Sequence, residues 1–410
     1  GMRRNANAKL IKQINTSTLL KRIRTHGPIS RAELVKSTSL SPTTVSVLVD
    51  ELIQEKLVKE IGTGESSGGR RPILLTFEPM SRLALGIDIG VRKTSVGLMD
   101  LEGSIISSIQ YEPDLTNRET FLRGIVHHTT AVLNANTEHR PNILGIGVAT
   151  PGLLDRERET IVYSSSLGLT DVPLYDTLTH HFSLPIRIDN DMNAAALGEK
   201  LMGAGQKIKD LIYVSVETGI GAGIIIDNQI YGGAFGNAGE FGHTTVEPNG
   251  AQCKCGNKGC LGVMAAEPAL LSRAIHLLAM GANTAMRSLL DGNISQVSLD
   301  IIVQAAKKGD PVALSVINDC MDYLAIGIAN LINMFDPAAI ILGGNTIETL
   351  GSLAVDRIAQ TVRTRVLPSH DRRPLTIIPG QLKHRVKLVG AGTLIFPEFL
   401  QYVEVLAKEA

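Results

Sequence analysis

The sequence contains no run of eighteen consecutive apolar residues, which is about the length that a membrane-spanning helix needs. Its most hydrophobic stretch, residues 324–344, is interrupted by Asn330, Asn333, Asp336 and Pro337. The basic N-terminus also lacks the apolar core and small-residue cleavage site of a signal peptide. We therefore expect a cytoplasmic protein without membrane insertion. A length of 410 residues exceeds one ordinary core and indicates two or three domains.

The chain as a whole has no excess of charge of either sign, which at first argues against a nucleic-acid partner. The charge is unevenly distributed, however. Residues 1–75 contain 13 Lys and Arg against 6 Asp and Glu, a net charge of +7 that leaves −7 for the rest. This asymmetry is typical of a basic DNA-binding module attached to an acidic effector domain, although a solvated basic arm would show it as well.

Cysteine is scarce, and three of the four cysteines lie within eight positions. Together with the preceding histidine they form a His-x9-Cys-x-Cys-x4-Cys pattern of His243, Cys253, Cys255 and Cys260. One nitrogen and three sulfur ligands complete the tetrahedral coordination that zinc prefers and leave no position open for a catalytic water. The pattern predicts a structural zinc site. The fourth cysteine, Cys320, lies in an apolar helical stretch and is expected in the core.

The first eighty residues have the start and stop signals of three short helices. Apolar residues recur at helical spacing from Thr16 and stop at His26-Gly27-Pro28. Ser30 begins a second helix, with Glu33 in the position of a capping box. Ser41 begins a third, with Pro42 at its first position. We expect two short helices joined by a tight turn, followed by a β-hairpin wing that runs through residues 58–61, a Gly/Ser tip and residues 73–75.

This arrangement predicts a winged helix-turn-helix that binds DNA. The helix from Pro42 exposes polar side chains in its first turns, where a recognition helix meets base edges in the major groove. Arginines at the end of the wing tip, in Gly69-Arg70-Arg71-Pro72, can enter a narrow minor groove. The alternative is a structural helical subdomain with a basic surface. The candidate DNA-binding residues are Arg31, Ser41, Thr43, Thr44, Ser46, Arg70 and Arg71.

Beyond Phe77 the pattern changes to an α/β alternation that contains an internal repeat. Three short strands over residues 85–106 recur in the same layout over residues 212–230. Each copy has an acidic residue two positions before a glycine in its first turn, as at Asp88 and Glu217, a layout that resembles the actin-like sugar kinase fold. We expect a winged helix-turn-helix over residues 1–81 and a two-lobed domain over 82–410. Lobe one is expected at about 82–190 plus the C-terminal helix, and lobe two at about 191–390.

A polar cluster follows a predicted strand between the two repeats, at Asp189-Asn190-Asp191. Polar groups at the carboxyl end of a strand in an α/β fold point into the ligand crevice. Asp191 is a candidate general base or hydroxyl acceptor. Helix capping by Asp189 or Asn190 is the ordinary alternative, and we expect capping and ligand binding to coexist.

With these motifs together, the chain resembles the ROK family of repressors and sugar kinases, and more closely its operon-repressor branch. The resemblance runs nearly end to end and implies that a sugar is bound by Asn190, Asp191, Glu240 and His243, with His243 also holding zinc. It is carried by residues 31–34, 69–72, 145–152, 190–191, 238–243 with the cysteines, and 390–392.

Two positions depart from the family pattern, and the first of them favours a regulator over an enzyme. The first phosphate turn reads Gly90-Val91-Arg92, which places side chains where the backbone must meet ATP, and phosphoryl transfer depends on such positioning. Gly262 stands where a glutamate that contacts the sugar is usual. We expect a sugar-responsive repressor that binds operator DNA as a homodimer or tetramer and responds to a sugar or sugar phosphate that closes the lobes. A sugar kinase with an added DNA-binding domain, and a scaffold for another protein, are the alternatives.

Overall fold

The computed structural model describes residues 2–66, 68–368 and 375–396, with side chains from residue 7 onward. The chain divides into two compact units. Unit 1 comprises residues 1–148, 174–188 and 391–410, and unit 2 comprises residues 149–173 and 189–390.

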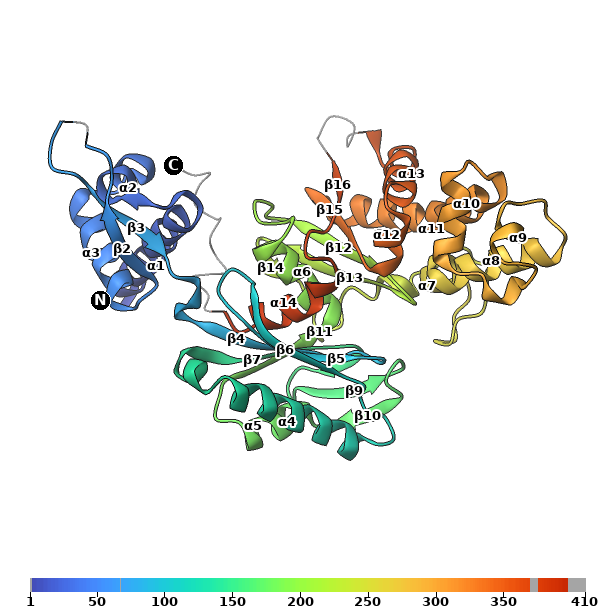
Figure 1. Ribbon diagram of the computed structural model, residues 1–410, viewed down its shortest axis with the longest axis horizontal. Coiled ribbons are helices and arrows are strands. Elements are labelled where there is room, and N and C mark those ends of the chain that lie inside the picture. The colour runs from blue at the N-terminus through green and yellow to red at the C-terminus, as the bar shows by residue number, and fades with distance from the viewer. Residues whose placement is uncertain (1, 67, 369–374, 397–410) are drawn as a thin grey trace. The chain divides into compact units, whose positions relative to one another are not determined.

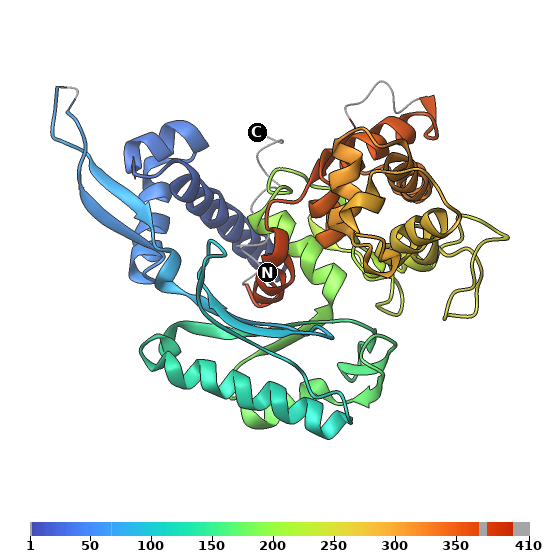
Figure 2. The same ribbon diagram turned by 45° about the vertical axis from the view of Figure 1, so that its right-hand side comes forward.

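The N-terminal part of unit 1 consists of three helices and a small sheet with strand order β1-β3-β2. Figures 1 and 2 both show the β2–β3 hairpin projecting from the helices as a wing. Leu19, Leu34 and Val45, one from each helix, are fully buried and form the common core. The elements are α1 (Met2–His26), β1 (Ile29–Ser30), α2 (Arg31–Thr38), α3 (Pro42–Gln54), β2 (Val58–Thr63) and β3 (Ile73–Phe77).

Both predicted helix caps are confirmed. Ser30 and Glu33 form a reciprocal capping box at α2, and the Ser41 side chain accepts a hydrogen bond from the backbone N–H of Thr44 at α3. The expected start of the first helix at Thr16 was wrong, because α1 begins at Met2. Residues 7–13 of this helix are exposed, so its first turns have no buried apolar face to give a periodic signal.

The rest of unit 1 is built on a five-stranded sheet of order β11-β7-β4-β5-β6. Strands β4 and β5 pair antiparallel from Ala84 opposite Met99 to Asp88 opposite Ser95. The elements are β4 (Leu83–Asp88), β5 (Thr94–Met99), β6 (Ile105–Tyr111), α4 (Arg118–Ala135), β7 (Ile143–Thr150), α5 (Leu174–His181) and β11 (Ile186–Asn190).

Unit 2 has a second five-stranded sheet, of order β14-β13-β12-β15-β16. Read from the other edge, this order matches that of the first sheet, with β12, β13 and β14 in the places of β4, β5 and β6. The predicted internal repeat is therefore confirmed. The strands are β12 (Leu211–Val216), β13 (Ile220–Ile226), β14 (Gln229–Ile230), β15 (Ala339–Gly343) and β16 (Thr376–Pro379).

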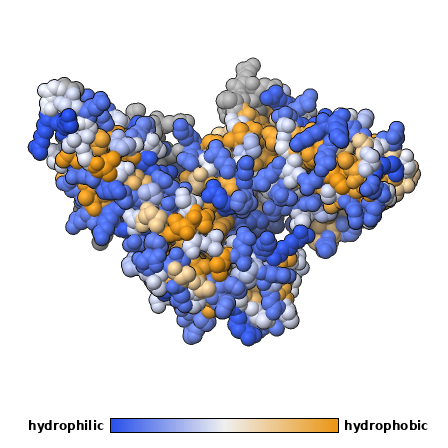
Figure 3. Space-filling view, in the orientation of Figure 1, coloured by the Kyte–Doolittle hydropathy of each residue, from blue (hydrophilic) through white to orange (hydrophobic). Residues whose placement is uncertain are grey.

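Helix α11 (Pro311–Phe335) forms the centre of the helical core of unit 2. It is long and apolar enough to cross a membrane, but Leu324 and Ile328 are fully buried in this core, as is Cys320, which was expected there. It is thus a core helix. The other helices are α6 (Asp191–Met202), α7 (Leu261–Ala265), α8 (Glu267–Ala279), α9 (Met286–Leu289), α10 (Leu299–Lys307), α12 (Asn345–Leu350), α13 (Ser352–Arg363) and α14 (Val386–Thr393). On the face drawn in Figure 3, hydrophobic and hydrophilic residues are interspersed.

A small antiparallel sheet belongs to unit 2, although the sequence analysis placed its residues in lobe one. It contains β8 (Leu153–Asp155), β9 (Thr160–Ser164) and β10 (Leu169–Val172). Arg156, which follows β8, donates to the Asp189 carboxylate at 3.1 Å and to the Gly236 carbonyl at 3.3 Å. These contacts join the sheet to segments that are distant in the sequence.

Candidate functional site

The start of α6 brings together the polar residues that the sequence analysis singled out. Asn190 caps the helix by accepting a hydrogen bond from the backbone N–H of Met192 at 2.9 Å, and it donates to the Gly152 carbonyl at 3.4 Å. Asp189 is buried and accepts hydrogen bonds from Arg156 and Asn193. Of the two capping residues that the sequence analysis offered, Asp189 and Asn190, it is therefore Asn190 that caps α6. The carboxylate of Asp191 remains available for other contacts.

Strand β13 contacts both the start of α6 and the segment that contains Glu240 and His243. A Cβ at Gly223 would come within 2.3 Å of the Met192 carbonyl oxygen. A Cβ at Gly242 would come within 2.1 Å of the Ile220 carbonyl oxygen. Glycine is required at both positions for these close approaches. The two approaches fix both polar segments against one strand of unit 2.

The carboxylates of this region influence one another. Desolvation raises the pKa of Asp191, the ammonium of Lys387 lowers it, and the charge of Glu217 raises it. Desolvation also raises the pKa of Glu240, where His243 acts in the opposite direction and Asp191 adds to the rise. The charges of Asp191 and His243 thus both act on the carboxyl group of Glu240.

Lys387 is a functional candidate that the sequence analysis did not name, and Glu217 was named there only as the acidic residue of a first turn. Lys387 Nζ lies 3.2 Å from Glu217 Oε2 and 3.7 Å from Asp191 Oδ2. The only signal in the sequence was position. Glu217 ends the first strand of the second repeat, and Lys387 stands three residues before the glycine of the 390–392 motif.

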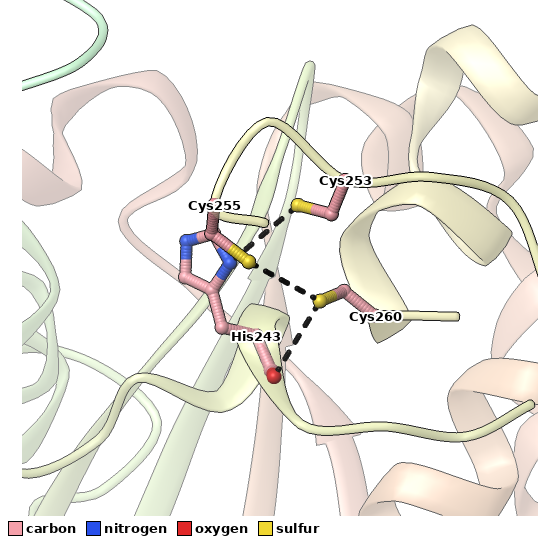
Figure 4. Close-up of side chains that lie close together, drawn as sticks. All are labelled: His243, Cys253, Cys255 and Cys260. Carbon is pink, nitrogen blue, oxygen red and sulfur yellow. Dashed lines mark hydrogen bonds between the residues drawn. The ribbon is translucent and has the colours of Figure 1, made fainter. Parts of the chain in front are cut away.

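The predicted metal ligands form one cluster (Figure 4). One ligand atom from each of His243, Cys253, Cys255 and Cys260 lies within 4.8 Å of all the others. The loop that carries them is held by backbone hydrogen bonds, including Gly259 N–H to the Ala251 carbonyl. Gly259 has a φ of +67°, and a Cβ there would come within 1.6 Å of the Glu247 carbonyl oxygen. This glycine is therefore required for the loop to fold back on itself.

The spacing of the ligand atoms fits a tetrahedral zinc ion. With Zn–S bonds of about 2.3 Å and a Zn–N bond of about 2.0–2.1 Å, two sulfur ligands lie about 3.8 Å apart and a sulfur and a nitrogen about 3.6 Å apart. Here the sulfurs of Cys255 and Cys260 are 3.6 Å apart, and the sulfur of Cys253 is 3.8 Å from Nδ1 of His243. The four residues thus form a metal-binding cluster of zinc dimensions.

The thiols of the cluster differ in acidity. The backbone N–H of Asn257 and the thiol of Cys253 lower the pKa of Cys255 to about 7, whereas burial raises that of Cys260 to about 11. Because zinc binds thiolates, the ion has to displace the proton of Cys260, whereas the lowered pKa of Cys255 favours its thiolate.

The candidate DNA-binding residues of α2 and α3 divide into two groups. Arg31 pairs with Asp50 at 2.9 Å and with Glu60 at 3.1 Å. Ser41 and Thr44 are engaged with each other at the cap of α3. Thr43 and Ser46, by contrast, are exposed on the outer face of α3. Val47 is exposed there as well, although the apolar pattern of this helix predicted it on the buried face.

The wing presents both predicted arginines. Arg70 and Arg71 are exposed at the end of the tip, and the hairpin is closed by the backbone N–H of Gly64, which donates to the Pro72 carbonyl at 2.8 Å. The Ser66 hydroxyl donates to the Gly69 carbonyl at 2.6 Å and accepts from the backbone N–H of Gly69. The described part of the tip is thus an ordered turn next to two guanidinium groups.

Comparisons with known proteins identify the family. A family model described as the ROK family matches residues 84–397. The xylose repressor of Bacillus spizizenii is 35% identical over 405 residues, which cover 98% of this chain and 99% of the repressor. The chain belongs to the ROK family.

Solved structures divide the ROK relatives into two kinds. A ROK family transcriptional regulator, described as a homologue of the Escherichia coli MLC protein, superposes with a TM-score of 0.80 at 27% identity and covers 96% of this chain and 98% of its own. A ROK glucokinase from Streptomyces griseus, in complex with glucose and AMPPNP, has a TM-score of 0.67 at 33% identity and covers 76% of this chain and 98% of its own. Full-length likeness to regulators makes this chain a ROK-family transcriptional repressor.

The first phosphate turn of this ROK chain lies between β4 and β5. A Cβ at Gly90 would come within 2.4 Å of the Lys93 carbonyl oxygen, so the turn itself requires this glycine. Val91 and Arg92 are exposed at the tip of the turn. Their side chains are therefore presented on the surface of a turn whose amides would have to approach phosphate closely.

Proposed function

We propose that this ROK repressor binds a sugar in unit 2 and that sugar binding changes its affinity for operator DNA. The observation that supports this most is the convergence of Asp191, Glu240 and His243 on β13 in a chain that also has a capped helix-turn-helix with an arginine-bearing wing. A sugar offers several hydroxyls, and a site of fixed charged acceptors and donors matches them. The side-chain amide of Asn190, which caps α6, would be a further hydrogen-bonding group for the sugar.

The DNA side of the proposal rests on the exposed residues of α3 and the wing. Thr43 and Ser46 supply hydroxyls for base edges in the major groove, and Val47 supplies an apolar contact for a thymine methyl. The exposed guanidinium groups of Arg70 and Arg71 would enter the minor groove. Arg31, Ser41 and Thr44 position the helices through their internal bonds and contact DNA less directly.

Zinc at the four-ligand cluster has a structural role in this proposal. Its chemistry when bound is that of a closed tetrahedral site that cross-links its ligands. His243 would then be tied to the cysteine loop, which holds the neighbouring Glu240 segment against β13.

A sugar kinase is the second candidate, favoured by the likeness to the glucokinase that holds glucose and AMPPNP. The exposed Val91 and Arg92 in the first phosphate turn argue against it, as does the carboxylate of Glu217 in the second turn, where it would repel phosphate. We propose a cytoplasmic, non-enzymatic regulator that acts as a homodimer or tetramer, because symmetric operators match symmetric proteins.

The proposal is tested with operator DNA that the purified protein selects from a random-sequence duplex library. Fluorescence anisotropy then measures DNA affinity while D-xylose, D-glucose, D-xylose 5-phosphate or D-glucose 6-phosphate is titrated. The expected result is a sugar-dependent change in the wild type that requires about tenfold or more additional sugar in Asp191→Asn, with sugar-free DNA affinity unchanged. A sugar response of equal midpoint in both proteins would place the effector site elsewhere.

A further inference from the structure

The ammonium of Lys387 bridges two carboxylates that come from distant parts of unit 2. It lies 3.2 Å from Glu217 Oε2, with a hydrogen bond, and 3.7 Å from Asp191 Oδ2. The side chains of Lys387 and Asp191 are 22% and 15% exposed, so this contact is largely shielded from solvent. Shielding makes the charge of Lys387 more effective on Asp191 than a surface ion pair would be.

The position of Lys387 is set by a close crossing of two helices. A Cβ at Gly390 of α14 would come within 2.0 Å of the Ala194 carbonyl oxygen of α6, and one at Gly198 of α6 would come within 3.0 Å of the Gly390 backbone. Lys387 precedes Gly390 by three residues, and Asp191 precedes Ala194 by three. The crossing therefore fixes the distance between the ammonium and the carboxylate through backbone contacts.

The backbone of Glu217 is fixed as well. Its N–H donates to the Gly219 carbonyl at 2.9 Å, and its carbonyl accepts from the Glu267 N–H at 3.0 Å. The Thr346 hydroxyl donates to the same carbonyl at 3.5 Å. Glu217 thus presents its carboxylate to Lys387 from a turn that is held by contacts with two other segments.

The charged groups around Asp191 belong to three elements and include both signs of charge. Lys387 on α14 supplies an ammonium and Glu217 after β12 supplies a carboxylate, while the charge of Asp191 in turn raises the pKa of Glu240, which precedes η3 (Phe241–His243). Asp189, two residues before Asp191, is already paired with Arg156 at 3.1 Å. Desolvation and the charge of Glu217 favour the protonated form of Asp191, and Lys387 opposes them.

We propose that Lys387 is a positioning residue of the sugar site, which keeps Asp191 in its carboxylate form so that it can accept hydrogen bonds from sugar hydroxyls, with Glu217 as the counter-ion that holds the ammonium between them. This inference rests on the proposed function, since it concerns the same site. A protonated Asp191 carries one donor and loses acceptor capacity, so a ligand of hydroxyl groups would bind it less well.

The test uses three variants of the full chain. Lys387→Met removes the ammonium at similar length, Lys387→Arg keeps the charge, and Glu217→Gln removes a like charge near Asp191. The pKa of Asp191 is measured in sugar-free protein by carbon-13 NMR of aspartate carboxyl groups, with the resonance assigned by Asp191→Asn. Wild-type zinc content and a wild-type far-ultraviolet circular dichroism spectrum in each variant establish that it is folded.

We expect Lys387→Met to raise the pKa of Asp191 by about one unit or more, Glu217→Gln to lower it, and Lys387→Arg to leave it near the wild-type value. Opposite pKa shifts in Lys387→Met and Glu217→Gln distinguish a charge effect from loss of structure, because loss of structure would shift the pKa of Asp191 in the same direction in both variants. An unchanged pKa in Lys387→Met, or shifts of the same sign in both variants, would overturn the inference.

Sugar binding is then measured by calorimetry between pH 5.5 and pH 8.5 with D-xylose and D-glucose. In Lys387→Met, apparent affinity should fall about tenfold for each pH unit below the raised pKa of Asp191, because the carboxylate fraction falls by that factor. It should return to near wild type at high pH. An affinity loss that is independent of pH would contradict the role of Lys387. Absence of binding of either sugar to the wild type would instead count against the proposed function, which the NMR titration does not address.

Discussion

Replacing Cys255 by serine should release the metal from unit 2. The four ligand atoms lie within 4.8 Å of one another, and the separations of 3.6 and 3.8 Å match the edges of a zinc tetrahedron. We predict one zinc ion per wild-type chain. Serine is a poor ligand for zinc at neutral pH, and a site with three ligands cannot close around the ion.

The expected loss of zinc affinity can be scaled from the smaller effect of removing a residue that only hydrogen-bonds to a metal ligand. Loss of an outer-shell partner weakens metal binding about 10–100-fold, so loss of a ligand should exceed 100-fold. A hundredfold loss corresponds to about 2.7 kcal/mol of stability when zinc is in excess, and at about 2–4 °C per kcal/mol the melting temperature should fall by roughly 5–10 °C.

The assay combines metal analysis with thermal unfolding in the presence and absence of EDTA. The matched control is Cys320→Ala, which removes a buried cysteine of α11 outside the cluster and should keep one zinc per chain. EDTA should lower the melting temperature of wild type and control but leave Cys255→Ser almost unchanged. Wild-type protein that contains no zinc when purified without a chelator, or Cys255→Ser that retains one zinc per chain, would refute the reasoning.

Three further predictions concern the other sites. Sugar-dependent ADP production should stay below an ordinary turnover of roughly 1 s⁻¹ in a coupled assay, because of Val91 in the first phosphate turn. The Arg70→Ala, Arg71→Ala double variant should lose operator affinity in anisotropy titrations, most on A·T-rich flanks, and unchanged affinity would remove the wing from the interface. Because burial raises the folded-state pKa of Asp191, its contribution to stability is present below about pH 4 and is lost as the pH rises through that pKa. Asp191→Asn should therefore melt at a higher temperature than wild type at pH 8, a difference that vanishes near pH 4; equal melting at pH 8 would contradict it.

What the sequence predicted well depends on interactions between near neighbours. The caps at Ser30 and Ser41 each involve a residue three positions along the chain, so a short motif contains both partners. The metal ligands lie within one loop, and their chemistry is specific enough to be recognised from spacing. The strand repeat was visible for the same reason, since each copy is a local pattern of apolar residues and turns.

What the sequence did not predict depends on packing between distant segments. Lys387 and Glu217 are 170 positions apart, and Lys387 also lies near Asp191 of α6 because Gly390 allows α14 to approach α6 closely. The assignment of strands β8–β10 to unit 2 depends likewise on Arg156, whose partner Asp189 is 33 positions away. No local pattern encodes such a contact, because a single lysine or arginine is equally typical of a solvated surface.

His243 belongs to both the metal cluster and the candidate sugar site, which has a chemical consequence. Its Nδ1 faces the sulfur of Cys253 at 3.8 Å. A histidine that binds a metal through one ring nitrogen keeps its proton on the other, so metal binding at Nδ1 would leave Nε2 as an obligatory hydrogen-bond donor. Asp191 and Glu240 supply acceptors when ionised, and a sugar hydroxyl both donates and accepts. Metal binding at Nδ1 would thus make Nε2 of His243 a hydrogen-bond donor, which the ionised carboxylates of Asp191 and Glu240 cannot supply. By linkage, loss of zinc should then weaken sugar binding, and sugar should increase zinc affinity by the same factor.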